Sequence, residues 1–223
     1  MKWLGVQTEK PWFLFLSYNA PHGPLQATKN DLAKFIHIKD KKRRTYAAVM
    51  FALDRGVGRV RSWLSENGQL DNTLIVFFSD NGGAPGNASW NGRLSGVKGS
   101  LREGGVRVPV IWSWPSKLPK GTRCETPVSS LDLLPTFLAA AEGAPLPLRP
   151  ALSHEDKRNH NKGTKMYGAY DGVNLLPILK GDKVAIKRTL YWRLQGQAAI
   201  RSGDDKLIRL SHRPAQFFHS ALD

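Results

Sequence analysis

An uninterrupted apolar run, Thr73-Leu-Ile-Val-Phe-Phe78, constrains the fold of this chain more than any other segment. The run is rich in β-branched and aromatic residues, and it stops abruptly at Ser79-Asp-Asn-Gly-Gly83. A strand that is apolar on both faces is typical of a central parallel strand covered by helices on both sides. The sequence therefore predicts a layered α/β fold, with polar side chains at the carboxyl end of this strand.

Other segments support this prediction. Residues 46–64 carry apolar side chains at three- and four-residue steps, which predicts an amphipathic helix that ends at Asn67-Gly68. Residues 12–18 and 106–114 are predicted as strands, the first of them buried, and residues 131–141 as a helix. The order of these elements indicates an α/β domain with a mostly parallel sheet flanked by helices.

The composition changes along the chain and predicts three parts. Residues 1–145 are predicted to form the α/β domain, and residues 146–170, rich in His, Asn and Lys after two prolines, an exposed linker or insertion. Residues 171–223 are predicted to form a small antiparallel unit. Its strands are expected at 191–194, 198–201 and 206–210.

The charge balance leaves several functions open. Lys and Arg number 33 against 18 Asp and Glu, a net charge of +15, which suits a solvated basic surface, a nucleic-acid binder or a protein with an anionic substrate. The basic runs lack the interleaved aromatic residues of a platform that stacks single-stranded nucleic acid, so nucleic acid is not the expected partner. A hydrophobic fraction of 41% with seven Trp excludes a disordered tail.

Three classes of protein are excluded or not supported. No apolar run approaches the roughly 18 residues needed to span a bilayer, so no membrane span is expected. The single cysteine, Cys124, excludes an intrachain disulfide framework and a cysteine-rich zinc site, and it is expected to be a structural thiol. The N-terminal residues do not form a convincing signal peptide, so the sequence does not predict the compartment.

Polar residues follow the predicted strands at places where a ligand would bind. In α/β sheets, ligands bind outside the carboxyl ends of the strands. His22 follows the first predicted strand, Asp80 and Asn81 follow the central strand, and Lys98 lies on the loop before the next one. These four side chains could therefore converge on one cleft.

Each of these residues also has an ordinary structural interpretation. Asp80 and Asn81 offer hard oxygen donors that suit Ca²⁺ or Mg²⁺, but Asp-Asn-Gly is also common turn chemistry. His22 could donate to an anionic oxygen or act as a general acid, and it could equally be a simple loop histidine. Lys98, between glycines, could reach an anion or be one basic residue among many. From the residues alone, the structural interpretations are favoured.

Three acidic residues receive structural predictions. Glu103 is expected to pair with Lys98 or with a nearby arginine and so to hold the loop. Asp54 is expected to have a buried capping or ion-pair role beside the apolar stripe of its helix. Asp132 fits a helix-start residue better than an acid catalyst.

Taken together, the segments resemble the sulfatase family of the alkaline-phosphatase superfamily. The motifs Ala20-Pro-His-Gly-Pro-Leu25, Ser79-Asp-Asn-Gly-Gly83 and Gly96-Val-Lys-Gly-Ser-Leu-Arg-Glu-Gly-Gly105 carry most of this resemblance. Further matching segments occur in the family's order at 11–17, 53–58, 130–136, 171–177 and 199–203.

The resemblance implies a fold and a function. It implies an incomplete alkaline-phosphatase-like fold and hydrolysis of sulfuric esters, either aryl or carbohydrate sulfates. By the same resemblance, Asp80 and Asn81 are ligands of the active-site Ca²⁺, with Mg²⁺ as the alternative ion. His22 contacts the sulfate near the leaving oxygen, and Lys98 binds the sulfate. Sulfatases are commonly exported or lysosomal.

The chain also departs from the family pattern. The Cys/Ser-x-Pro-x-Arg motif that becomes the formylglycine nucleophile does not occur here, and neither do the metal aspartates near the family's N-terminus. Cys124 lies downstream of the lysine motif and does not replace the nucleophile. The chain is therefore expected to be a truncated sulfatase whose Met1 is an internal or misassigned start, with little activity alone.

Two other functions stay open. The first is a phosphodiester or phosphonate hydrolase fragment of the same superfamily, because a histidine and a lysine suit either tetrahedral anion. The second is a non-catalytic, basic protein that binds polyanions, because of the net charge of +15.

Overall fold

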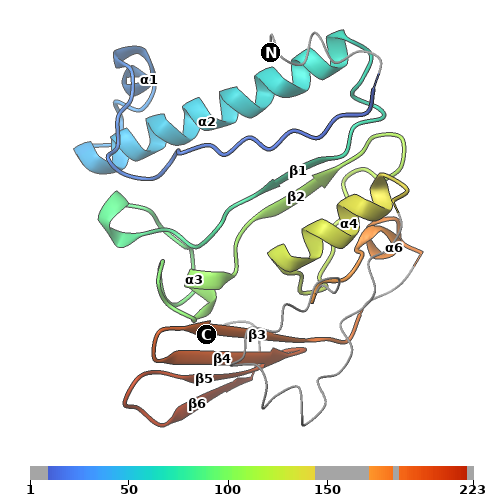
Figure 1. Ribbon diagram of the computed structural model, residues 1–223. Helices are drawn as coiled ribbons and strands as arrows, with labels where there is room; N and C mark the ends of the chain where they lie inside the picture. Colours follow the sequence, from blue (N-terminus) through green and yellow to red (C-terminus); the bar gives the residue numbers. More distant parts are fainter. Residues whose placement is uncertain (1–9, 144–170, 183–185, 220–223) are drawn as a thin grey trace, which may run out of the picture. The chain divides into compact units, whose positions relative to one another are not determined.

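The computed structural model describes residues 10–143, 171–182 and 186–219, which fall into two compact units (Figure 1). The first unit contains the described residues of Met1–Ser116 and Tyr191–Asp223, and the second contains those of Lys117–Leu190. The predicted linker lies outside the described residues, so the predicted division into domains stays a prediction. Within the described ranges, no helix has both the length and the apolar character that crossing a membrane requires.

The longest element of the first unit is helix α2, Lys41–Glu66, which confirms the helix predicted over residues 46–64. The Asp40 carboxylate caps its start by accepting a backbone N–H of the first turn at 2.6 Å. The helix ends at Asn67, followed by Gly68 with φ +66°, as the sequence predicts. Its buried side chains lie on one face, which explains why two internal glycines do not interrupt it.

A short helix, α1, Lys29–Ala33, is attached to α2 by a buried carboxylate. Both oxygens of Asp31 accept hydrogen bonds from the Arg55 guanidinium, at 2.5 and 3.0 Å. The hydrogen bond from Arg55, with a second from the Thr28 hydroxyl, lowers the pKa of Asp31 to about 2. The ionised form of Asp31 therefore stabilises the contact between the two helices.

The strands predicted at 73–78 and 106–114 are present as β1, Ile75–Phe78, and β2, Val110–Ser113, but they pair antiparallel. Parallel neighbours need a crossover, usually through a helix. The segment between β1 and β2 contains only short helical turns, η2, Pro85–Asn87, and α3, Glu103–Val106, so the chain returns beside β1 in the opposite direction. The mostly parallel sheet that the apolar pattern predicts is not seen in the described residues.

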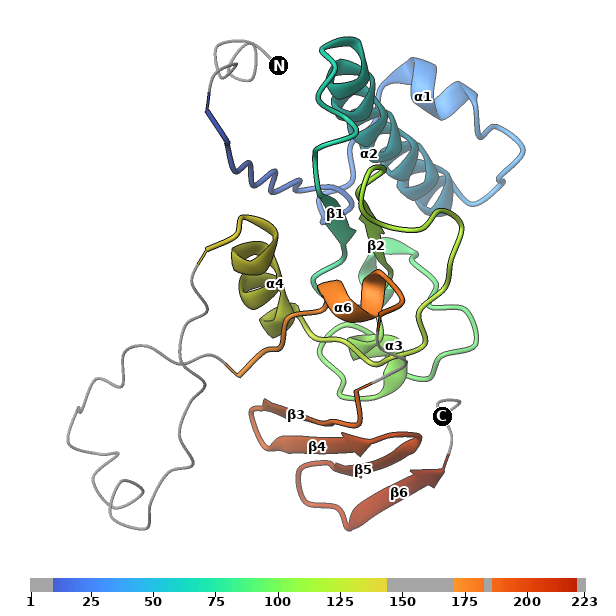
Figure 2. The same cartoon turned by 90° about the vertical axis from the view of Figure 1, so that its right-hand side faces the viewer.

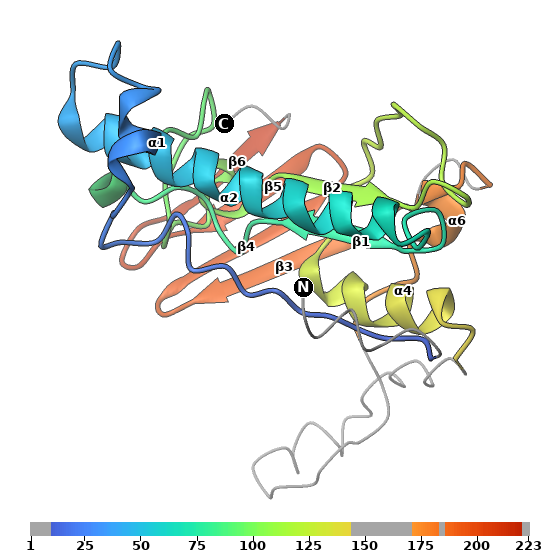
Figure 3. The ribbon, with the colours of Figure 1, turned by 90° about the horizontal axis from the view of Figure 1, so that it is seen from above.

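The buried strand predicted at 12–18 is wrong. Residues 11–19 form neither helix nor strand in the structure, and Figure 3 shows them as an extended segment. The side chains of Phe13 and Phe15 are 68% and 71% exposed. An apolar pattern leads to burial only if another layer covers it, and both of these side chains stay mostly exposed in the structure.

Residues 189–219 contain a four-stranded sheet, which confirms the antiparallel strands predicted in this part of the chain (Figure 2). Its strands lie in chain order and are β3, Thr189–Leu194, β4, Gln197–Ser202, β5, Asp205–Arg209, and β6, Ala215–His219. The fourth strand was not predicted. Ala199 and Ile208 of this sheet are buried against Leu101, which belongs to the segment between β1 and β2.

The second unit contains a 3₁₀ turn, η3, Ser130–Asp132, continuous with helix α4, Leu133–Ala140, and a short helix α6, Leu176–Leu179, that contacts α4. These elements confirm the helix predicted at 131–141. Asp132 is fully buried, accepts the Ser129 N–H at 2.7 Å in a capping box, and forms an ion pair with Arg188 at 2.6 Å. Asp132 is thus the helix-start residue that the sequence predicts.

Candidate active site

The four predicted site residues lie in loops of the first unit. His22 lies in the turn after residue 19, Asp80 and Asn81 lie just after β1, separated from it by Ser79, and Lys98 lies between β1 and β2. We call residues 94–105 the lysine loop. The side chains of His22, Asp80 and Lys98 are exposed and that of Asn81 is half-buried, so a dissolved ligand can reach all four.

Hydrogen bonds join the lysine loop to the end of β1. The backbone N–H of Lys98 donates to the carbonyl oxygen of Gly83 at 3.1 Å. The side chain of Asn91 bridges the same two segments, because its Oδ1 accepts the Gly83 N–H at 2.8 Å and its Nδ2 donates to the Gly96 carbonyl at 3.1 Å. The backbone of Lys98 is therefore hydrogen-bonded to Gly83, which lies two positions after Asn81 in the sequence.

The strand end and the lysine loop approach each other so closely that glycines are required. Gly82 donates its N–H to the Gly105 carbonyl at 3.0 Å. A Cβ atom on Gly82 would lie 1.8 Å from the carbonyl oxygen of Gly104. Any side chain at Gly82 would push the lysine loop away from β1.

The loop that carries His22 is joined to the same segment. The Asn87 side chain donates from Nδ2 to the carbonyl oxygen of Pro21 at 2.9 Å. The Nδ1 atom of His22 lies 2.8 Å from the carbonyl oxygen of Gly23, and a carbonyl can only accept, so Nδ1 carries the proton in this contact. The Nε2 atom is then available to a ligand, as an acceptor in neutral imidazole and as a donor in imidazolium.

Two oxygen donors at the strand end fit part of a Ca²⁺ site. The Asn81 side chain donates from Nδ2 to the Gly82 carbonyl at 3.0 Å, a bond that does not use its Oδ1 acceptor. Ca²⁺ takes roughly 6–8 oxygen ligands. Among the residues that the structure describes, no group of three or more His, Cys, Asp and Glu is placed to hold a metal ion. Asp80 and Asn81 can therefore supply only part of a coordination shell.

Glu103 anchors the lysine loop, but through residues that the sequence did not indicate. Its buried carboxylate accepts from Lys206 Nζ at 2.6 Å and from Arg201 at 2.9 Å. The expected pairing with a nearby arginine is confirmed by Arg107, whose Nη1 lies 4.0 Å from Oε2, whereas Lys98 is exposed and is not a described partner of Glu103. Arg201 and Lys206 lie 98 and 103 positions further along the chain, a distance at which a sequence pattern gives no pairing signal.

Two other structural predictions are wrong. Asp54 is exposed, not buried, because it points away from the apolar face of α2. Cys124 is a free, exposed thiol, so it has no buried structural role.

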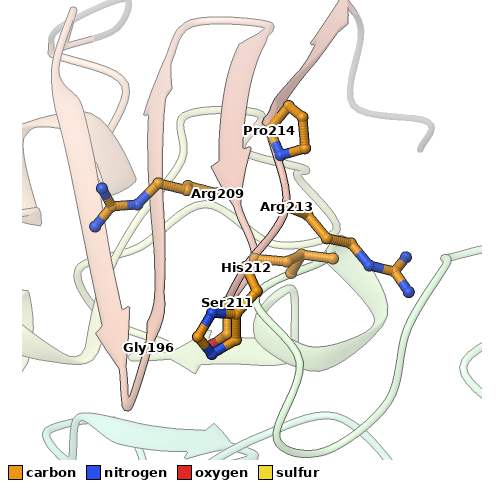
Figure 4. A pocket seen from close by; sticks show the side chains of 7 residues that line it. Gly196, Arg209, Ser211, His212, Arg213 and Pro214 are labelled. Atoms are coloured by element: carbon orange, nitrogen blue, oxygen red, sulfur yellow. The ribbon is translucent and has the colours of Figure 1, made fainter.

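The two described cavities lie elsewhere. One, of about 360 Å³, lies on the C-terminal sheet, where the turn at Gly196 faces Arg209 and the turn from Ser211 to Pro214. Figure 4 shows the side chains of Arg209 and Arg213 pointing to opposite sides. The other, of about 520 Å³, is a shallow groove along α2 between Asp54 and Glu66. None of the four predicted site residues lines either of these two cavities.

Comparison with known proteins identifies the class. The family model described as Sulfatase matches residues 1–144, and the chain therefore belongs to the sulfatase family. It is 38% identical over 134 residues to arylsulfatase J of Mus musculus, covering 60% of this chain and 22% of that protein. It is 34% identical over 177 residues to the uncharacterized sulfatase YdeN of Escherichia coli (strain K12), covering 78% of this chain and 28% of that protein.

Solved structures agree with the family assignment. The chain superimposes on Ps i-CgsB, solved in complex with k-i-k-neocarrahexaose, with a TM-score of 0.79 and 38% identity. The match covers 96% of this chain and 45% of that one. The described fold is thus alkaline-phosphatase-like, as found in sulfatases. The chain spans less than half the length of these relatives.

Proposed function

We propose that this chain carries part of the active site of a sulfuric ester hydrolase. His22 and Lys98 contact the sulfate group, and Asp80 and Asn81 are ligands of a divalent cation. The hydrogen bond from Lys98 to Gly83 carries the proposal, because it attaches the lysine beside the two oxygen donors. The bond from Asn87 to Pro21 adds the histidine loop to the same network.

The chemistry of the four residues suits this reaction. Hydrolysis breaks the bond between sulfur and the ester oxygen, consumes water, and yields an alcohol and hydrogen sulfate. The Lys98 ammonium offsets the negative charge of the sulfate group. The His22 imidazolium, with Nδ1 bonded to the Gly23 carbonyl, can donate the Nε2 proton to the departing oxygen.

Ca²⁺, or Mg²⁺ as the alternative, would be held in part by Asp80 and Asn81. The ion supplies positive charge that stabilises the anionic transition state when it is bound. The formylglycine motif of the family does not occur in this sequence, so the roles proposed here are limited to binding and proton donation. For the complete catalytic domain we keep the proposal of a mostly parallel sheet, with β1 and β2 as an antiparallel part of it.

A sulfated carbohydrate is the proposed substrate class. The chain is 38% identical to Ps i-CgsB, whose structure was solved with a carrahexaose. The net charge of +15 also suits a substrate that carries several negative groups.

The proposal is tested by calorimetric titration of the 223-residue chain with sodium sulfate, in the presence and absence of CaCl₂. We expect sulfate to bind more tightly with Ca²⁺ present, and to bind more tightly than inorganic phosphate. Equal affinity for the two anions would favour the phosphodiester or phosphonate alternative. Sulfate binding that ignores Ca²⁺, together with a steep salt dependence of binding to sulfated polysaccharide, would favour the non-catalytic binder of polyanions.

A further inference from the structure

We infer that Glu103 is a positioning residue for Lys98, through which the C-terminal sheet holds the lysine in place to meet an anion. This inference rests on the proposed function, since it assumes that Lys98 is the anion-binding group. Glu103 does not itself touch the anion in this scheme, because its carboxylate is buried.

Both carboxylate oxygens of Glu103 accept hydrogen bonds from the C-terminal sheet, and Arg107, which follows α3, lies 4.0 Å from Oε2. Oε1 accepts from Lys206, which is itself 3% exposed, and Oε2 accepts from Arg201. The Lys206 ammonium also lies 5.3 Å from the centre of the Trp192 ring. A carboxylate that receives two charge-assisted hydrogen bonds out of water is held in one geometry.

The residues after Glu103 lie directly beneath the turn that presents Lys98. The N–H of Ser100 donates to the Val97 carbonyl at 2.9 Å, which places Lys98 and Gly99 at the two central positions of a β-turn. Gly99 has φ +86°, as the third position of a type II turn requires. A Cβ atom on Gly105 would lie 2.0 and 2.7 Å from the carbonyl oxygens of Ser100 and Val97, so both ends of this turn rest on Gly105.

The neighbour of Glu103 on its other side strengthens the same attachment. The Arg102 guanidinium donates to the Gln216 side chain at 3.1 Å and lies 5.4 Å from the centre of the Phe218 ring. Leu101 is buried in the cluster that contains Ile208 of the sheet. The lysine loop is therefore held by the sheet at Leu101–Glu103, while the N–H of Lys98 is held by Gly83, in the segment after β1.

The substitution Glu103→Gln distinguishes a positioning role from a purely electrostatic effect, because the two predict opposite changes in the affinity for sulfate. Removal of a negative charge should by itself leave sulfate binding unchanged or make it tighter. If Glu103 positions Lys98, the dissociation constant for inorganic sulfate should instead rise roughly tenfold. We expect this rise in the folded 223-residue chain, with faster hydrogen exchange at the Lys98 amide and unchanged exchange within α2.

Glu142→Gln is the matched control, since it makes the same change of charge at an exposed side chain of the second unit. It should leave both measurements at their original values. Because Glu103→Gln removes the carboxylate that faces Arg107, Arg201 and Lys206 and could prevent folding, the double variant Glu103→Gln/Lys206→Met is the second test. It preserves the net charge, and we expect the same weakening of sulfate binding.

The outcomes distinguish this inference from the proposed function. If Lys98→Ala leaves sulfate affinity unchanged, the proposed site is wrong. If Lys98→Ala weakens binding but folded Glu103→Gln, or the double variant, binds sulfate as tightly as the original chain, the site stands and the positioning role is overturned.

Discussion

Lys98 and Gly83 are joined by a 3.1 Å backbone hydrogen bond, so the lysine loop and the carboxyl end of β1 form one structural unit. The side chain of Asn91 contacts both segments and reinforces the bond. The relative positions of Lys98 and of the oxygen donors Asp80 and Asn81 therefore depend on the hydrogen bonds of Gly83 and Asn91.

Replacement of Lys98 by Ala should weaken binding of inorganic sulfate roughly tenfold or more, because a charge-assisted hydrogen bond to the anion is lost. Isothermal titration calorimetry measures the dissociation constant directly. Lys120→Ala is the matched control, since it removes an exposed cation from the second unit. An equal loss of sulfate affinity in Lys98→Ala and Lys120→Ala would mean that sulfate binding depends only on the net charge of the protein.

Replacement of Asp80 by Ala should reduce Ca²⁺ affinity roughly tenfold or more, because the carboxylate is the only anionic ligand that the proposal assigns. The measurement is a CaCl₂ titration followed by calorimetry. Asp54→Ala removes a carboxylate that is also exposed but lies on α2, and it should leave Ca²⁺ binding unchanged. If Asp80→Ala binds Ca²⁺ as tightly as the original chain, Asp80 is not a ligand of the ion.

Replacement of Asp132 by Ala should destabilise the protein by about 3–5 kcal/mol, because Arg188 would lose its buried ion-pair partner. The Ser129 and Val173 N–H groups would also lose their acceptor. Urea unfolding measures the free energy. Glu125→Ala breaks an exposed ion pair with Arg123 and should cost less than about 1 kcal/mol. A similar loss of unfolding free energy in Asp132→Ala and Glu125→Ala would contradict the view that the buried ion pair contributes more than the exposed one.

The contact between Asp31 and Arg55 should make stability depend on pH in the acid range. The pKa of Asp31 is lowered to about 2, chiefly by its hydrogen bond with Arg55, whereas an unfolded aspartate titrates near about 3.9. The stabilisation is therefore fully present above the unfolded value and is lost as the pH falls towards 2. The difference in melting temperature between the original chain and Asp31→Asn should shrink over that interval. A constant difference would refute the assignment.

Local sequence patterns predict much of this fold for physical reasons. Helix α2 follows from apolar periodicity over many residues, and its end follows from a glycine at positive φ. The boundaries of β1 and of the C-terminal strands follow from apolar runs between turn-forming residues. The same patterns do not give strand direction, which depends on how the chain connects β1 to β2.

The sequence also limits what could be predicted about the site. Resemblance to a family singled out His22, Asp80, Asn81 and Lys98, although each alone has an ordinary structural interpretation. The distant partners of Glu103, Arg201 and Lys206, could not be predicted, because tertiary pairing over about a hundred residues has no local signature. The exposure of Phe13 and Phe15 was missed, because hydrophobicity does not report whether a covering layer is present.

The ion pair between Glu103 and Arg201 makes the segment between β1 and β2 depend on the last strands of the chain. A stop codon placed before β4 would leave the residues of α2, β1 and β2 in place, yet it would remove Arg201 and Lys206, the two cations that form hydrogen bonds with the buried Glu103 carboxylate. We therefore expect substitutions at Glu103 and Arg201 to co-vary among related sequences.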